Sequence, residues 1–159
     1  MFSRLDHGSA LRRALLAGAA AVALGGCSTM SNMMPSMSKD TVKLGATLSG
    51  TAEVPPNAST GKGMAEATLN KETNLLRWTI TYSGLTGPVS AGHFHGPAMA
   101  GQNAGVVVPF KGGTASPIEG EATLTPQQAA DLMAGKWYAN LHTAAHPGGE
   151  IRGQMTPSP

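Results

Sequence analysis

Residues 41–49 read TVKLGATLS, and every second side chain in this stretch is apolar. The apolar positions are Val42, Leu44, Ala46 and Leu48. Successive side chains of an extended chain point to opposite faces, so these four share one face and most of the polar side chains share the other. The stretch therefore predicts a β-strand with one face in a hydrophobic core and the other in water.

Seven more stretches of strand-like sequence follow, separated by segments rich in Gly, Pro and Asn. They are residues 63–70, 75–83, 90–95, 105–110, 118–124, 136–143 and 150–156. The separating residues favour turns, and we expect residues 71–74 to form a hairpin loop. Eight short strands joined by turns predict an all-β fold, either a sandwich or a barrel. Trp78 and Trp137 are expected to anchor its core.

One segment departs from the strand pattern and predicts a short helix. Thr125 is placed to cap this helix, a proline follows it, and Gln128 completes a capping box. Gly135 is expected to end the helix. The helix should cover an edge or an end of the sheet, with Leu132 and Met133 packed beneath it.

The N-terminus has the parts of a secretion signal. Three arginines precede an apolar run at residues 14–24, and two glycines follow the run. At about 1.5 Å per residue the run covers roughly half of a ~30 Å hydrocarbon core, so it is too short to span a membrane. We therefore expect residues 1–26 to be a signal peptide that is removed.

The end of this leader, residues 24–27, reads LGGC and resembles the lipobox of bacterial lipoproteins. We expect cleavage before Cys27 and attachment of acyl chains, palmitate among them, at this residue. Cys27 is the one cysteine of the chain. The alternative is an ordinary secretory signal, which would leave an unpaired thiol in an oxidising compartment. Ser28 follows in place of the Asp that retains Gram-negative lipoproteins in the inner membrane, so we expect the outer membrane.

Cleavage at this position changes the charge of the protein. The leader contains three of the 11 Lys+Arg and one of the nine Asp+Glu, which leaves eight of each. The remainder consists of a flexible Met- and Ser-rich tether at residues 27–39 and one domain at residues 40–159. It is neutral and has no basic cluster, so nucleic acid is not an expected partner. The expected partners are the membrane, through the lipid anchor, and envelope proteins or a metal ion.

Three ordered motifs in this domain resemble the CHRD domain, which is named for chordin. They are EVPP at residues 53–56, HFHGP at residues 93–97, and a C-terminal segment that contains NLHT at residues 140–143 and GEIRGQ at residues 149–154. The resemblance spans about residues 42–156. It implies an antiparallel immunoglobulin-like or Greek-key fold and a secreted or lipid-anchored protein. It does not imply an activity, and growth-factor binding is not carried over.

Four of the five histidines lie in or beside these motifs, namely His93, His95, His142 and His146. His93 and His95 are two residues apart on a predicted strand, so their imidazoles share a face. His142 ends another predicted strand, and His146 follows it across a turn. Neighbouring strand ends would bring the four imidazoles together as a metal site. Imidazole ligands suit Cu(II), Zn(II) and Ni(II), and the Irving–Williams order favours copper.

The number and role of these ligands stay open. CHRD proteins often have Asn at the position of His146, which implies that three or four histidines take part. The His-x-His pattern also resembles part of the copper site of copper,zinc superoxide dismutase, but the remaining ligands of a dinuclear site are absent. The alternative is structural, with one histidine bonded to a backbone carbonyl near Gly96 and another packed beside Trp137 or Tyr138.

The tether adds four thioether side chains, Met30, Met33, Met34 and Met37. Thioethers are soft ligands that select Cu(I), although methionines are also found in linkers without a role. Among charged residues, Glu150 and Arg152 are expected to pair on one strand face as a structural contact.

No hydrolase motif or phosphate-binding loop is present in the sequence. We therefore expect a binding module with no catalytic residues, anchored by lipid in the cell envelope, whose His-rich site takes copper or zinc. Two alternatives remain. One is a metal-free adhesion or envelope-interaction protein, and the other is a mononuclear copper redox enzyme.

Overall fold

The computed structural model describes residues 40–158 of the chain, and these form one antiparallel sheet of eight strands. The strands are β1 (Thr41–Ser49), β2 (Lys62–Asn70), β3 (Leu75–Ser83), β4 (Val89–His95), β5 (Val106–Pro109), β6 (Ile118–Thr123), β7 (Trp137–Thr143) and β8 (Ile151–Pro157). Two short helices, η1 (Gly50–Ala52) and α1 (Pro126–Met133), complete the domain. The predicted all-β class is confirmed. Within the described residues, no helix is long and apolar enough to cross a membrane.

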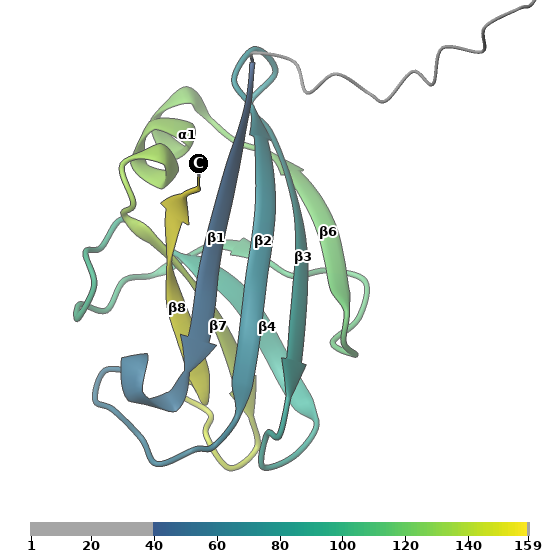
Figure 1. The fold of residues 1–159 in the computed structure, drawn as a ribbon, viewed down its shortest axis with the longest axis vertical. Coiled ribbons are helices and arrows are strands. Elements are labelled where there is room, and N and C mark those ends of the chain that lie inside the picture. The colour runs from purple at the N-terminus through teal and green to yellow at the C-terminus, as the bar shows by residue number, and fades with distance from the viewer. Residues whose placement is uncertain (1–39, 159) are drawn as a thin grey trace, which may run out of the picture. The chain divides into compact units, whose positions relative to one another are not determined.

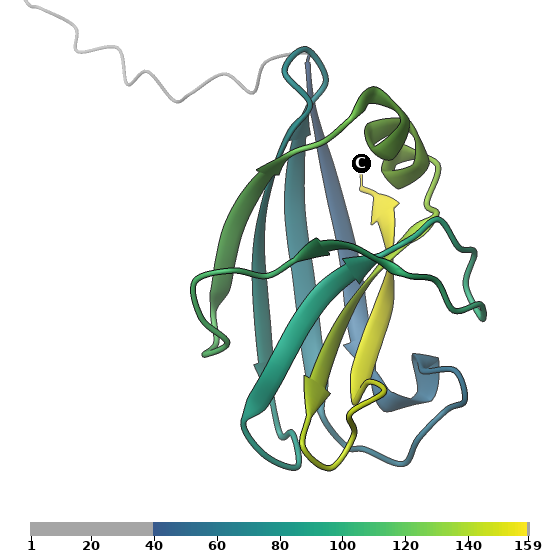
Figure 2. The same cartoon turned by 180° about the vertical axis from the view of Figure 1, so that it is seen from behind.

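The sheet curls into a nearly closed barrel (Figures 1 and 2). Its strand order is β5-β4-β7-β8-β1-β2-β3-β6, so β5 and β6 are the two edges. The connections from β3 to β4 and from β6 to β7 each join two strands that are not neighbours in the sheet. Aromatic rings from opposite ends of the strand order meet in the interior. The ring centroid of Trp78 on β3 lies 5.4 Å from that of Phe94 on β4 and 5.6 Å from that of Phe110.

The core fills the interior of the barrel with side chains from the inward face of each strand. On β1, Leu44 and Leu48 are buried, and Val42 and Ala46 pack against the core, as the alternation predicts. Trp78 and Trp137 are 5% and 1% exposed, which confirms them as core residues. Burial of a large apolar side chain stabilises a fold by about 1.5–3 kcal/mol, so these positions supply much of the driving force.

Helix α1 has the predicted capping box. The Thr125 hydroxyl accepts from the Gln128 amide N–H at 3.2 Å, and the Gln128 side chain accepts from the Thr125 N–H at 2.8 Å. Gly135 follows with a positive φ of 71°. The helix lies at one end of the barrel, beside the last residues of β8 (Figure 1). Leu132 is buried as predicted, but Met133 is 37% exposed, since adjacent helical residues point about 100° apart.

Strands β4, β7 and β8 are neighbours, and a layer of loop covers their outer face. Every residue of β7 is buried, although only alternate side chains can enter the barrel. Residues 50–61 and 96–105 supply these loops, which are bonded to the sheet through Arg152 and Tyr138. The outer face of β4, β7 and β8 is therefore a second, polar interior between the sheet and the two loops.

Candidate metal centre

Three of the predicted ligands meet on the outer face of the barrel. His93 and His95 come from β4, and His142 comes from the adjacent β7. The pairing of the strands places Ala91 opposite His142, only two residues from His93. Each of the three histidines offers one ring nitrogen, and these nitrogens all lie within 4.8 Å of one another. Among residues 40–158, this is the group of His, Cys, Asp and Glu side chains that is compact enough to hold a metal ion.

A backbone carbonyl fixes the orientation of His95. Its Nδ1 lies 3.0 Å from the carbonyl oxygen of Ala104, in the loop between β4 and β5. A carbonyl can only accept, so Nδ1 carries the proton and Nε2 keeps its lone pair. Within the described residues, Nε2 is buried and has no hydrogen-bond partner. A protonated nitrogen bonded to a carbonyl and a second nitrogen left free is the usual state of a metal-binding histidine.

His142 is held in the same way from the other side. Its Nδ1 lies 3.0 Å from the carbonyl oxygen of Pro147, which leaves Nε2 as an acceptor. That Nε2 lies 3.3 Å from Nδ1 of His93. Two nitrogens bound at 2.0–2.1 Å to a tetrahedral ion lie about 3.3–3.4 Å apart. The spacing therefore suits a shared ion, and in its absence the pair forms a hydrogen bond.

The surroundings of His93 and His95 favour the neutral form of both imidazoles. Burial lowers the pKa of His93, and the nearby His142 and His95 lower it further. Burial also lowers the pKa of His95, and the charge of Arg152 acts in the same direction. A metal ion binds the neutral imidazole, so both shifts favour the form of the side chain that can coordinate.

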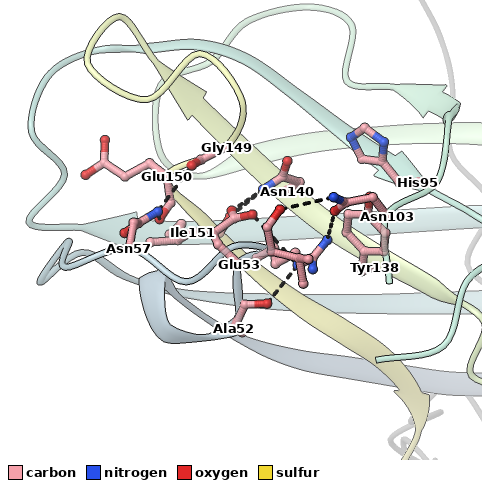
Figure 3. A network of polar contacts seen from close by, with 12 residues as sticks. Ala52, Glu53, Asn57, His95, Asn103, Tyr138, Asn140, Gly149, Glu150 and Ile151 are labelled. Carbon is pink, nitrogen blue, oxygen red and sulfur yellow. Dashed lines mark hydrogen bonds and ion pairs between the residues drawn. The ribbon is translucent and has the colours of Figure 1, made fainter. Parts of the chain in front are cut away.

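The His95 ring stacks on Tyr138, and Arg152 in turn contacts the Tyr138 ring. Tyr138 of β7 stacks on His95, with centroids 4.9 Å apart and an angle of 5° between the planes. The Arg152 guanidinium of β8 lies 4.5 Å from the centroid of Tyr138. Figure 3 shows His95 and Tyr138 at one end of a polar network that runs on through Asn103 and Glu53. His95 thus has both features of the structural alternative, the carbonyl bond and the aromatic contact.

The model of the CHRD domain matches residues 44–155, most of the chain. The chain belongs to the CHRD domain family. No curated protein and no solved structure matches it. The fold and the histidine cluster described above are therefore those of a CHRD domain.

The fourth predicted ligand of this CHRD domain, His146, lies outside the cluster. It is not among the three residues whose nitrogens gather within 4.8 Å. It lies in the turn after β7, where its N–H donates to the Thr143 carbonyl at 3.1 Å, and it lines a surface pocket together with Glu53. Burial raises the pKa of Glu53, and the charge of His146 is close enough to oppose that rise. The structure thus brings together three of the four histidines.

The expected pair of Glu150 and Arg152 is wrong. Arg152 instead faces Glu53, with Nε 3.7 Å from the carboxylate, and both side chains are buried. Glu150 comes just before β8 and is fully buried. Hydroxyls donate to it from Ser59, Thr86 and Thr143. The two acidic residues of the family motifs therefore have separate sets of partners.

Two contributors to the site were not predicted from the sequence. They are the carbonyl oxygens of Ala104 and Pro147, which set the tautomers of two histidines. Every residue has a carbonyl, so no residue type marks these positions. The predicted lipid site Cys27 and the four tether methionines lie outside the described residues.

Proposed function

We propose that this CHRD domain binds a copper ion through His93, His95 and His142. The observation that supports this most directly is a pair of hydrogen bonds, from His95 to the Ala104 carbonyl and from His142 to the Pro147 carbonyl. They leave a lone pair on Nε2 of His95 and on Nε2 of His142, in a cluster where the three histidines each offer a ring nitrogen within 4.8 Å of the others. A buried nitrogen with no partner is costly unless it has a ligand, and Nε2 of His95 is such an atom.

Copper is favoured over zinc by the chemistry of the ligands. The set contains imidazole nitrogens only, and for such ligands Cu(II) binds more tightly than Zn(II). Three protein ligands leave at least one position on the ion for water or another molecule. His93 is only half-buried, so that position can be reached from solvent. An open, exposed position suits exchange of the metal, and it also suits the alternative of a mononuclear copper redox enzyme.

We further propose that the protein is held at the cell envelope by lipid on Cys27, at the outer membrane. The support is the LGGC sequence at residues 24–27 and the serine that follows. The domain would then be exposed to copper outside the cytoplasm, where soluble thiols do not compete for the metal. Envelope proteins are the partners available there.

Calorimetric titration with Cu(II) and Zn(II) tests the metal proposal. The protein is the chain from residue 27 onward with Cys27→Ser, because a free thiol would compete for copper. We expect one copper ion per chain, bound more tightly than zinc. A His93→Ala/His95→Ala double variant should bind at least about a hundredfold more weakly, since two of three ligands are lost. His146→Ala is the matched control and should bind as the parent does.

The outcomes separate the candidate functions. Copper binding of equal strength in the parent and the double variant would overturn the proposal. In that case, capture of envelope proteins that persists in chelator and in the double variant would favour the adhesion alternative. Consumption of superoxide or peroxide by the copper-loaded protein, faster than by free copper and lost in the double variant, would favour the redox enzyme.

A further inference from the structure

The barrel has a seam where its two edge strands face each other. Strands β5 and β6 each pair with one neighbour and not with one another. A cavity of about 270 Å³ lies at this seam. Three strands supply most of its walls, with Val107 and Pro109 on β5, Gly120 and Ala122 on β6, and Trp78 on β3, and Gln128 of α1 also lines it. None of the clustered histidines lines it, so this cavity is separate from the candidate metal centre.

Trp78 brings a buried hydrogen-bond donor to this cavity. The residue is 5% exposed, and within the described residues its Nε1 has no hydrogen-bond partner. The indole lies flat against Gly120, where a Cβ atom would come within 2.4 Å of the ring and 3.0 Å of Nε1. The N–H is thus buried against β6, next to the cavity that Trp78 lines. Buried indole N–H groups are normally paired, so this one points to an acceptor that the chain itself does not supply.

The remaining walls combine apolar surface with a cationic rim. Val107 and Ala122 are half-buried and Leu124 is buried, which gives an apolar lining. Lys111 is exposed at the rim, and among residues 40–158 no ion pair involves it. The carboxylate of Glu121, also at the rim, is already paired with Arg77 at 2.8 Å. The free charge at the mouth is therefore positive.

We propose that the seam cavity binds a small amphipathic carboxylate, a molecule with a short hydrocarbon chain and an anionic head. The chain packs against Val107 and Ala122. The head accepts the Trp78 N–H, and Lys111 balances its charge. A cavity of about 150 Å³ is enough to hold benzene, so 270 Å³ has room for a chain of several carbons. This inference does not depend on the metal proposal.

Octanoate is the probe, and the indole N–H is the reporter. The chain has two tryptophans, so a ¹H–¹⁵N spectrum of the full-length protein has two indole signals, and Trp78→Phe identifies one of them. We expect octanoate to move the Trp78 signal downfield, as a new hydrogen bond does, and to leave the Trp137 signal in place. Trp78→Phe should bind octanoate about three- to tenfold more weakly in calorimetry, the effect of one hydrogen bond.

Two further variants keep the proposal testable if Trp78→Phe folds poorly. Lys111→Gln should weaken octanoate by about two- to fivefold and leave octanol unchanged, because only octanoate is charged. Ala122→Leu fills the cavity and should weaken both ligands. Lys62→Gln is the matched control for charge, since Lys62 does not line the cavity. The His93→Ala/His95→Ala variant should bind octanoate normally.

The proposal is overturned by either of two results. One is an unmoved Trp78 indole signal at saturating octanoate, which would leave water as the partner of the N–H. The other is binding that Lys111→Gln and Ala122→Leu do not change, which would place octanoate elsewhere on the protein.

Discussion

At the scale of single residues, the candidate centre depends on which nitrogen of each imidazole carries its proton. In His95 and His142 the proton is on Nδ1, because the Ala104 and Pro147 carbonyls accept it. Both rings therefore present a lone pair without a change of tautomer or a rotation. These two rings therefore need little reorganisation to bind a metal, whereas His93 must first give up the Nδ1 proton that it donates to His142.

The lowered pKa values of His93 and His95 predict how copper affinity depends on pH. Protons compete with copper for the same nitrogens, and burial keeps both rings neutral below the ordinary histidine pKa of 6.5. We expect affinity for Cu(II) to stay nearly constant down to about pH 6.5 and to fall only in more acidic solution. Competition with a chelator of known affinity across this range measures it. A steep loss already above pH 7 would contradict the prediction, because the pKa values of His93 and His95 would then not be lowered.

Glu150 predicts a separate loss of stability in acid. Burial alone raises the pKa of its carboxyl, but hydrogen bonds from Thr143, Ser59 and Thr86 outweigh this and lower the pKa to about 2. The folded state thus holds the proton less tightly than the unfolded state, whose pKa is near 4.5. This contribution to stability is complete above about pH 4.5 and disappears as the pH falls toward about 2.

Glu150→Gln tests this assignment. The variant keeps the shape of the side chain and removes the charge, so it should lower the free energy of unfolding near neutral pH by about 2 kcal/mol. Urea unfolding at several pH values measures both effects. The difference between parent and variant should shrink in acid, and a difference that is independent of pH would disprove the role of the carboxylate. Glu119→Gln, at an exposed position on β6, is the control.

The sequence predicts some of these residues and not others, for definite reasons. The spacing of His93 and His95 is enough to place both on one face of a strand. The position of His142 depends on β4 and β7 being neighbours, which is a long-range pairing that no local pattern encodes. His146 is in a turn, where the backbone direction changes within a few residues, so strand periodicity does not predict where its side chain points.

At the scale of elements, Arg152 joins β8 to both loops of the outer layer. Its Nε donates to the Ala52 carbonyl at 2.8 Å, and its Nη1 donates to Asn103 at 2.9 Å. Ala52 ends η1 in one loop, and Asn103 precedes the Ala104 carbonyl that orients His95 in the other (Figure 3). One side chain therefore contacts both loops and, through the second of them, helps to position His95.

Arg152→Met should destabilise the domain strongly, because it leaves the Glu53 carboxyl buried without its cation. Removing one partner of a buried ion pair costs about 3–5 kcal/mol. Glu53→Gln/Arg152→Met removes both charges, and we expect it to recover part of that loss in urea unfolding. The double variant should still bind copper more weakly than the parent, since the Asn103 contact is gone. Parent-like affinity would show that the loop positions His95 without Arg152.

The elements themselves are predicted well, and their partners are not. Gly, Pro and Asn mark the turns, so strand and helix boundaries follow from local chemistry, as at the hairpin of residues 71–74 and the capping box of α1. The neighbours of each strand depend on how the whole sheet closes. The separation of Glu150 from Arg152 has a local cause, because the last strand is predicted from residue 150 but begins at Ile151, so Glu150 does not follow its alternation.

At the scale of the whole molecule, the histidine cluster and the seam cavity lie on different parts of one sheet. The histidines lie outside the barrel on β4 and β7, and the seam cavity lies between β5 and β6. Strand β4 pairs with both β5 and β7, so it connects the two regions. The sites share no lining residue, and variants of one should therefore leave the other intact.

The proposed anchor sets where such a molecule works, and Cys27→Ser tests it in the bacterial cell. A thiol is required for lipid transfer, and a serine hydroxyl does not replace it. We expect the parent to incorporate labelled palmitate and to sediment with membranes until detergent is added. The variant should carry no label and should leave the membrane pellet or keep its uncleaved leader. His93→Ala/His95→Ala, which alters only the domain, should be labelled and sediment like the parent. Labelling of the Cys27→Ser variant would refute the anchor. Several acyl chains give stable attachment to a membrane. Parent protein that is released without detergent and carries no label would therefore indicate an ordinary secretory signal.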